Sequence, residues 1–138
     1  MGRRLTRPFI AASALTICGI LATGCVSDEP LGGPLVAEVA SPTPQAALQA
    51  IASGASRCWS SGDLGAYSAI PELDTQAGRP RILIVEKGRR AGTLPALVIE
   101  AEADPTRIRT YGPLSATQSS ARINADIIRW STGGRGCR

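Results

Sequence analysis

Along the chain, apolar positions change from helical spacing to strand-like alternation and back again. Between residues 43 and 62 they recur every three or four positions, the period of a helix with one buried face. Thr43 and Pro44 suit a helix start, as a capping side chain and a first helical residue, and Ser61 and Gly62 suit its end. The apolar stripe consists of Ala47, Leu48, Ile51, Ala52, Ala55, Cys58 and Trp59.

Four apolar or alternating runs follow this helix and predict β-strands. They cover residues 66–70, 81–86, 94–103 and 107–111. We expect Pro71 to close the first strand and Pro113 to close the last, because proline has no N–H for a ladder bond. Short loops between these runs favour an antiparallel meander.

The turn between the last two strands sets a register that the sequence predicts. Asp104 followed by Pro105 fits the first two positions of a type I turn. A two-residue loop there places Asp104 opposite Arg107, and Glu102 opposite Arg109. One face then carries Glu100, Glu102, Arg107 and Arg109, and the other carries Ile99, Ala101, Ile108 and Thr110. We therefore interpret the glutamates as cross-strand ion-pair partners on a solvated face, not as a catalytic acid pair.

Residues 116–131 form the last predicted element. Ile123, Ile127 and Trp130 share one helical face, which favours a helix. Alternation of Ala and Ile over residues 121–127 leaves a strand as the alternative. The expected order is thus α-β-β-β-β-α, an α+β two-layer sandwich of an antiparallel meander of about four strands with two helices on one face.

Two strands carry apolar residues on both faces. Ile82–Val85 and Leu97–Ile99 are continuous apolar runs, which are typical of a sheet covered on both sides. If both helices lie on one face, then Leu83 and Val98 face the other. The sequence leaves four covers open for that face: the N-terminal tether or local loops, a second copy of the chain, an envelope protein partner, or an apolar ligand.

The N-terminus is basic and then apolar. Arg3, Arg4 and Arg7 precede a short apolar stretch over residues 9–23, the pattern of a secretory signal and too short for a membrane span of about 20 residues. Leu21-Ala22-Thr23-Gly24-Cys25 resembles the lipobox of bacterial lipoproteins. The resemblance implies that residues 1–24 are removed and that Cys25 is diacylated. An ordinary signal cut elsewhere, which leaves Cys25 as a free thiol, is the alternative.

The lipoprotein resemblance implies a domain plan and a location. Residues 25–42 are then a flexible tether, consistent with its Pro and Gly content, and residues 43–138 form one small domain. The acylated Cys25 holds the chain to a membrane. Val26 in place of an acidic residue favours the outer membrane, with the domain facing the periplasm.

Charge gives no reason to expect a nucleic-acid partner. The chain has 15 basic and 11 acidic residues, and three of the arginines lie in the predicted signal. The remaining charge is close to balanced. A local exception is the turn Lys87-Gly88-Arg89-Arg90, where Lys87, Arg89 and Arg90 form either an anion contact or a solvated hairpin tip.

Cysteine usage predicts a disulfide in the mature domain. Cys18 lies in the signal, which leaves Cys58 and Cys137 as a pair in an oxidising envelope. A zinc site and a redox thiol pair are the alternatives, and the absence of histidine argues against zinc. Trp59 and Trp130 would both lie near this bridge, as core packing.

No catalytic constellation is visible in the sequence. Without histidine, a Gly-x-Ser-x-Gly elbow or a phosphate loop, we expect no enzyme, no metal and no cofactor. The leading hypothesis is an envelope lipoprotein with a non-enzymatic interaction, assembly or structural role. The alternative is a binding module for an amphipathic or anionic envelope ligand.

Overall fold

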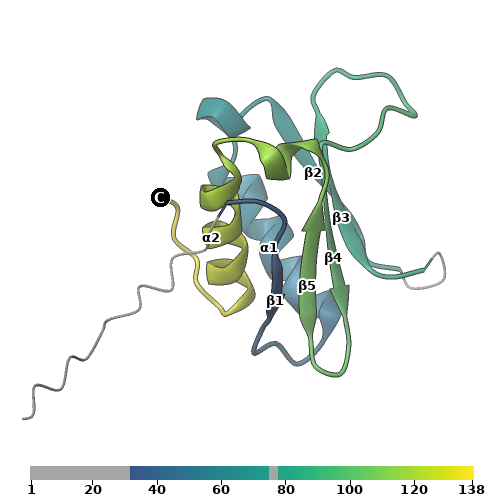
Figure 1. Cartoon of the computed structure of the whole chain (residues 1–138), viewed down its shortest axis with the longest axis vertical. Coiled ribbons are helices and arrows are strands. Elements are labelled where there is room, and N and C mark those ends of the chain that lie inside the picture. The colour runs from purple at the N-terminus through teal and green to yellow at the C-terminus, as the bar shows by residue number, and fades with distance from the viewer. Residues whose placement is uncertain (1–31, 75–77) are drawn as a thin grey trace, which may run out of the picture.

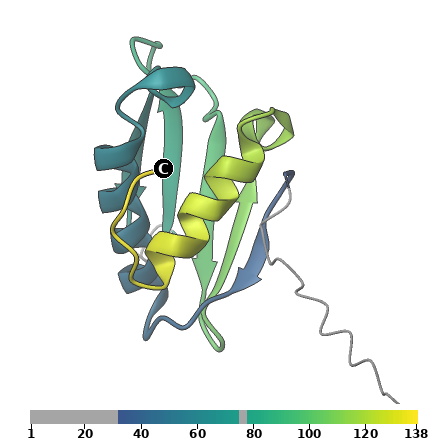
Figure 2. The ribbon, with the colours of Figure 1, turned by 90° about the vertical axis from the view of Figure 1, so that its left-hand side faces the viewer.

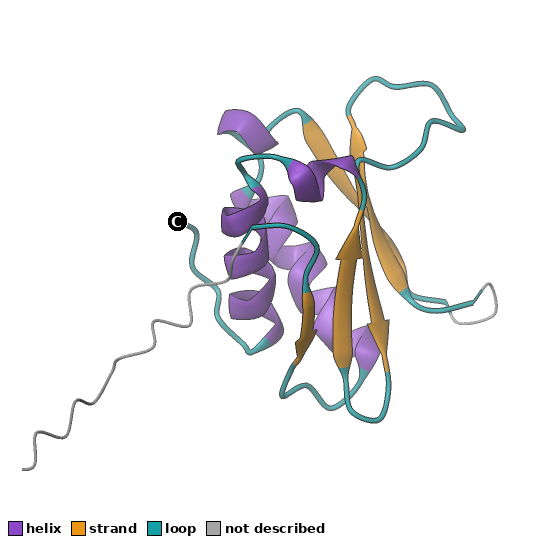
Figure 3. Cartoon of the chain, in the orientation of Figure 1, coloured by secondary structure: helices purple, strands orange, loops and turns teal. Residues whose placement is uncertain are grey.

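The structure is a computed structural model that describes residues 32–74 and 78–138. The predicted signal segment and Cys25 lie outside these ranges. The described residues form an α+β fold of two helices and a five-stranded antiparallel sheet (Figure 1 and Figure 3). The expected fold class is therefore correct, with one strand more than the four that the sequence indicated.

Both helices cover the same face of the sheet, and the strands run in the order β1-β5-β4-β3-β2 (Figure 2). The helices are α1 (Pro44–Cys58) and α2 (Ser120–Ser131), with short 3-10 helices η1 (Gly62–Leu64) and η3 (Pro113–Ala116). The strands are β1 (Val36–Glu38), β2 (Tyr67–Glu72), β3 (Arg81–Glu86), β4 (Leu97–Glu102) and β5 (Arg107–Tyr111).

Helix α1 forms as its sequence predicts. Thr43 caps it, since its Oγ1 accepts a hydrogen bond of 3.1 Å from the backbone N–H of Ala46. All seven residues of the predicted apolar stripe are buried in the core. The same core receives Ile82, Ile84 and Leu97 from the helix-facing side of β3 and β4.

The last element is a helix, which decides between the two alternatives that the sequence left. Ile123, Ile127 and Trp130 are all buried on the face of α2 that meets the sheet and α1. The Trp59 and Trp130 rings pack at 5.3 Å between centroids, as expected for core tryptophans near the bridge.

The register of the β4–β5 hairpin differs from the prediction by two residues. The turn spans the four residues 103–106 and has Asp104 at φ 58°, so it is not the two-residue type I loop. The pairs are Glu102 with Arg107 and Glu100 with Arg109. A shift of two keeps each side chain on its predicted face, because strands alternate with period two, so acid still opposes base.

The predicted tether of residues 25–42 is wrong over its C-terminal part. Val36–Glu38 pairs with β5 as an edge strand. The backbone N–H of Leu35 donates to Thr110 Oγ1 at 2.8 Å, and that of Val39 donates to the Thr106 carbonyl at 2.9 Å. A strand of three residues is too short for its alternation to be visible in sequence. Val36–Glu38 forms a strand because it pairs with β5.

Two strand boundaries also moved. Pro71 lies inside β2 and does not close it, because β2 is an edge strand and tolerates a missing N–H on its free side. Strand β4 begins at Leu97, so the residues from Leu94 to Ala96, which we expected in the strand, belong to the β3–β4 loop. This loop is larger than the turn that the sequence indicated.

Gly54 of α1 lies directly against Trp130 of α2. A Cβ placed on it would lie 2.2 Å from Cδ2 and 2.5 Å from Cε2 of Trp130. Real Cβ atoms do not reach such distances, so the indole ring rests directly on the α1 backbone.

We expect Gly54→Ala to destabilise the domain by about 1–3 kcal/mol through overpacking, although alanine favours helix formation. Chemical denaturation followed by tryptophan fluorescence measures this. Ser53→Ala, at the exposed neighbouring position of the same helix, is the matched control and should leave stability unchanged or slightly raised. Equal stability of the two variants would contradict the close contact.

Cys58 and Cys137 form a disulfide, as predicted, with their Cα atoms 5.2 Å apart. It joins the end of α1 to the tail after α2 across a sequence separation of 79 residues. The same tail is held by hydrogen bonds to the Gly136 carbonyl from Trp130 Nε1 and Arg129 Nε, at 3.1 and 3.2 Å.

The double substitution Cys58→Ala and Cys137→Ala should lower the free energy of unfolding by about 4 kcal/mol, because a long loop in the unfolded chain is no longer closed. Urea denaturation of the oxidised chain and of the double variant measures the difference. A reducing agent should lower the stability of the native chain and leave the double variant unchanged. A native chain insensitive to reduction would refute this stabilising role.

Candidate functional site

The face of the sheet that points away from the helices carries an apolar row across four strands. Pairing aligns Ile70, Leu83, Val98 and Tyr111 side by side. Leu83 is half-buried, and Val98 is buried, at 6% exposure, in the middle of the row. Within the described residues, no helix or strand lies over this face (Figure 1). Strand β1, from the predicted tether, extends the sheet edge and does not cover the row.

Exposed large apolar side chains gather on this side of the molecule. They are Val36 at 65%, Ile70 at 46%, Leu94 at 87% and Tyr111 at 44% exposure. Three of them project from the open face, and Leu94 belongs to the β3–β4 loop, which leans away from the helices (Figure 1). Scattered exposed apolar residues are ordinary, but here three of the four lie on one face of the sheet.

Charged residues on the open face pair largely with one another. Arg81 Nε contacts Glu72 at 2.7 Å, and Glu102 receives Arg79 at 2.7 Å and Arg109 at 3.5 Å. At the β1 edge, Arg107 contacts Glu38 at 2.9 Å. These exposed pairs contribute little to stability, but they neutralise the border of the apolar row.

Tyr111 links the apolar row to this charged border. Its hydroxyl donates a hydrogen bond of 2.7 Å to Oε1 of Glu100. That bond, with partial burial and the charge of Glu100, raises the pKa of Tyr111 above its usual value. A tyrosine with a raised folded-state pKa stabilises the fold at neutral pH, and this contribution is lost as the pH rises through that pKa.

We expect the Tyr111 phenol to titrate above the ordinary value of about 10. The chain has two tyrosines, so an ultraviolet absorbance titration of the Tyr67→Phe variant reports on Tyr111 alone. Adding Glu100→Gln should lower the midpoint, because the hydrogen bond to a charged acceptor is lost. A midpoint that does not respond to Glu100→Gln would contradict the contact.

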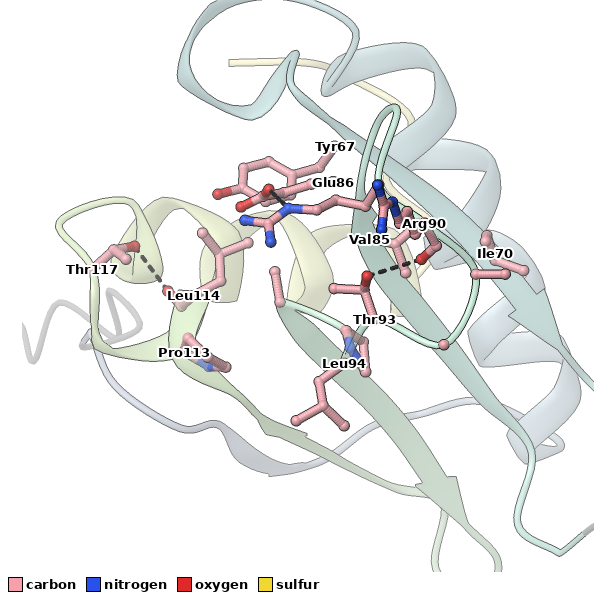
Figure 4. A pocket seen from close by; sticks show the side chains of 15 residues that line it. Tyr67, Ile70, Val85, Glu86, Arg90, Thr93, Leu94, Pro113, Leu114 and Thr117 are labelled. Atoms are coloured by element: carbon pink, nitrogen blue, oxygen red, sulfur yellow. Dashed lines mark hydrogen bonds and ion pairs between the residues drawn. The ribbon is translucent and has the colours of Figure 1, made fainter.

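A pocket of about 530 Å³ lies at the end of the sheet, between the β3–β4 loop and η3 (Figure 4). Ile70 and Val85 contribute to it from the sheet, and Leu94 contributes from the loop. The other residues lining it are Tyr67, Glu86, Arg89, Arg90, Ala91, Gly92, Thr93, Pro95, Ala96, Pro113, Leu114 and Thr117. The pocket thus adjoins the apolar row through Ile70.

The three cations predicted as a possible anion contact do not all line the same pocket. Arg89 and Arg90 line the pocket, whereas the Lys87 amino group donates to the Gly65 carbonyl at 2.6 Å and borders a different hollow. Arg89 forms an ion pair with Glu86, which raises the pKa of the guanidinium. Across residues 32–74 and 78–138, the Arg90 side chain has no hydrogen bond or ion pair.

A buried carboxylate between the helices is a feature that the sequence did not signal. Asp126 is 1% exposed, and its Oδ2 accepts a hydrogen bond of 2.9 Å from Trp59 Nε1. Its Oδ1 accepts from Arg129 one turn along α2. Every polar atom of this carboxylate thus has a partner, and the group serves the helix interface and not the pocket.

The described part of the chain offers neither a metal cluster nor a membrane span. It contains no group of three or more His, Cys, Asp or Glu residues arranged to hold a metal. None of its helices is both long and apolar enough to cross a bilayer.

No protein-family model, curated protein or solved structure matches this chain. The geometry of the open face and pocket is therefore the basis for a functional proposal.

Proposed function

We propose that this chain is a membrane-anchored envelope protein that acts, without catalysis, by binding another protein through the open face of its sheet. The observation that carries the proposal is the apolar row with Ile70 and Tyr111 exposed at its two ends. Because the surrounding charges are paired within the chain, the fitting partner surface is apolar and carries no excess charge. The anchor rests on the lipobox-like residues that end at Cys25.

Photocrosslinking in cells, with the full chain, tests this contact. Photoreactive residues at Val36 and Tyr111, on the open face and outside the pocket, should capture one dominant protein. The same probe at Ser53, exposed on α1, is the matched control and should not capture it. Equal capture from both sides of the molecule would contradict the proposal.

A substitution within the row makes the test specific. With the probe at Val36, Tyr111→Lys should reduce capture roughly tenfold, since a charge replaces an apolar contact. The exposure of Tyr111 means that this change does not disturb the core. Crosslinks only to other residues of the same chain would show that the chain itself covers the open face, and would contradict the proposal.

A second candidate function, binding of an amphipathic or anionic ligand, is favoured by the pocket beside Arg90.

A further inference from the structure

We propose that the pocket between the β3–β4 loop and η3 binds a single-chain amphipathic carboxylate, such as a long-chain fatty acid, with Arg90 as its charged contact. This inference extends the second candidate function and does not depend on the protein contact proposed for the open face.

The size and lining of the pocket fit one apolar chain. Its volume of about 530 Å³ falls within the range of about 300–1,000 Å³ that is usual for small-ligand sites. Val85 from β3 and Leu114 from η3 give the pocket apolar lining from two elements, and the highly exposed Leu94 belongs to the loop that borders it (Figure 4). Two hydroxyls at the pocket are already engaged, since Thr93 donates to the Arg90 carbonyl and Thr117 to the Leu114 carbonyl, each at 2.8 Å.

The engaged hydroxyls bear on the kind of ligand. A sugar or another polyhydroxylated ligand needs several polar partners inside its site. Here the hydroxyls of Thr93 and Thr117 already donate to backbone carbonyls of the protein. An alkyl chain needs no polar partner. The lining has one further hydroxyl, that of Tyr67. One hydroxyl is too few for a polyhydroxylated ligand, so the body of the ligand is apolar, and its polar end is recognised by the charged residues at the pocket.

The charge at the pocket indicates one negative group. Of its three charged residues, Glu86 and Arg89 form an ion pair with each other. Arg90 remains as one positive charge without a partner in the described chain. A guanidinium binds a carboxylate through two parallel hydrogen bonds, which makes a monocarboxylate the matching head group.

The pocket also has an outlet for a longer tail. Ile70 lines it and is at the same time the first residue of the open-face row. Leu83 of β3 pairs with Ile70 of β2, so an alkyl chain that leaves the pocket at Ile70 continues onto apolar surface.

Displacement of a fluorescent polyunsaturated fatty acid, cis-parinarate, tests the proposal. The protein is the full chain with Cys25→Ser, which prevents acylation and leaves every described residue unchanged, stripped of residual lipid. We expect saturable binding of the probe and its displacement by oleate. Oleyl alcohol, which has the same chain but no charge, should compete about tenfold less well, the value of one charge-assisted hydrogen bond.

Two pairs of variants locate the site. Arg90→Gln should weaken oleate binding about tenfold, whereas Arg135→Gln, with the same loss of charge on the exposed C-terminal tail, should change it less than about twofold. Leu94→Asp should weaken binding more than Leu94→Asn, because only the former adds a negative charge at the pocket. Leu94 is 87% exposed, so both chains should fold.

Three results would overturn the proposal. They are no saturable binding by the Cys25→Ser chain, equal competition by oleate and oleyl alcohol, and equal affinity of the Arg90→Gln and Arg135→Gln variants. None of them affects capture at Val36 and Tyr111, which lie outside the pocket, so failure here is distinguishable from failure of the protein contact.

Discussion

The arrangement of this domain depends on one close contact, in which the Trp130 ring lies against the backbone of α1 at Gly54. Because α1 has no side chain at this position, the Trp130 ring fits between the two helices, which lie side by side on one face of a five-stranded sheet. Asp126 strengthens the same interface by accepting a hydrogen bond from Trp59, and the disulfide closes it at the end of α1. A larger residue at position 54 would separate the helices and expose the core between them.

The confinement of both helices to one side has a direct consequence for the opposite side. The central strands are apolar on both faces of the sheet, but the helices cover only one face, which leaves apolar side chains on the other. The open face has paired charges at its border, and its neighbours cover Val98 at the centre. At one end, the β3–β4 loop turns this exposed apolar surface into a pocket with a cation, which is the most specific chemistry in the described chain.

Local patterns explain which parts of this structure were predictable from sequence. The α1 stripe and the buried faces of β4 and β5 follow from periodicity alone, and the pairing of Cys58 with Cys137 follows from elimination. The β4–β5 register was missed because the four-residue turn depends on Asp104 adopting a positive φ, which its neighbours do not signal. Asp126 and the pocket arise from residues far apart in sequence: Asp126 needs Trp59, and Leu114 meets Val85 only in the fold. The sequence showed the basic turn, but only the geometry separates Lys87 from Arg90.

The ordered segment around β1 also limits how far the domain can lie from Cys25. Gly33 donates to Ser120 Oγ at 3.1 Å, and Ser120 follows Thr117 of the pocket, so the chain enters the domain at the pocket end. If Cys25 carries acyl chains as the sequence predicts, the distance from Cys25 to Gly32 is limited by the chain length to at most about 25 Å. If the pocket also binds a fatty acid as proposed, this attachment would keep the pocket end within about 25 Å of the lipid from which the ligand comes.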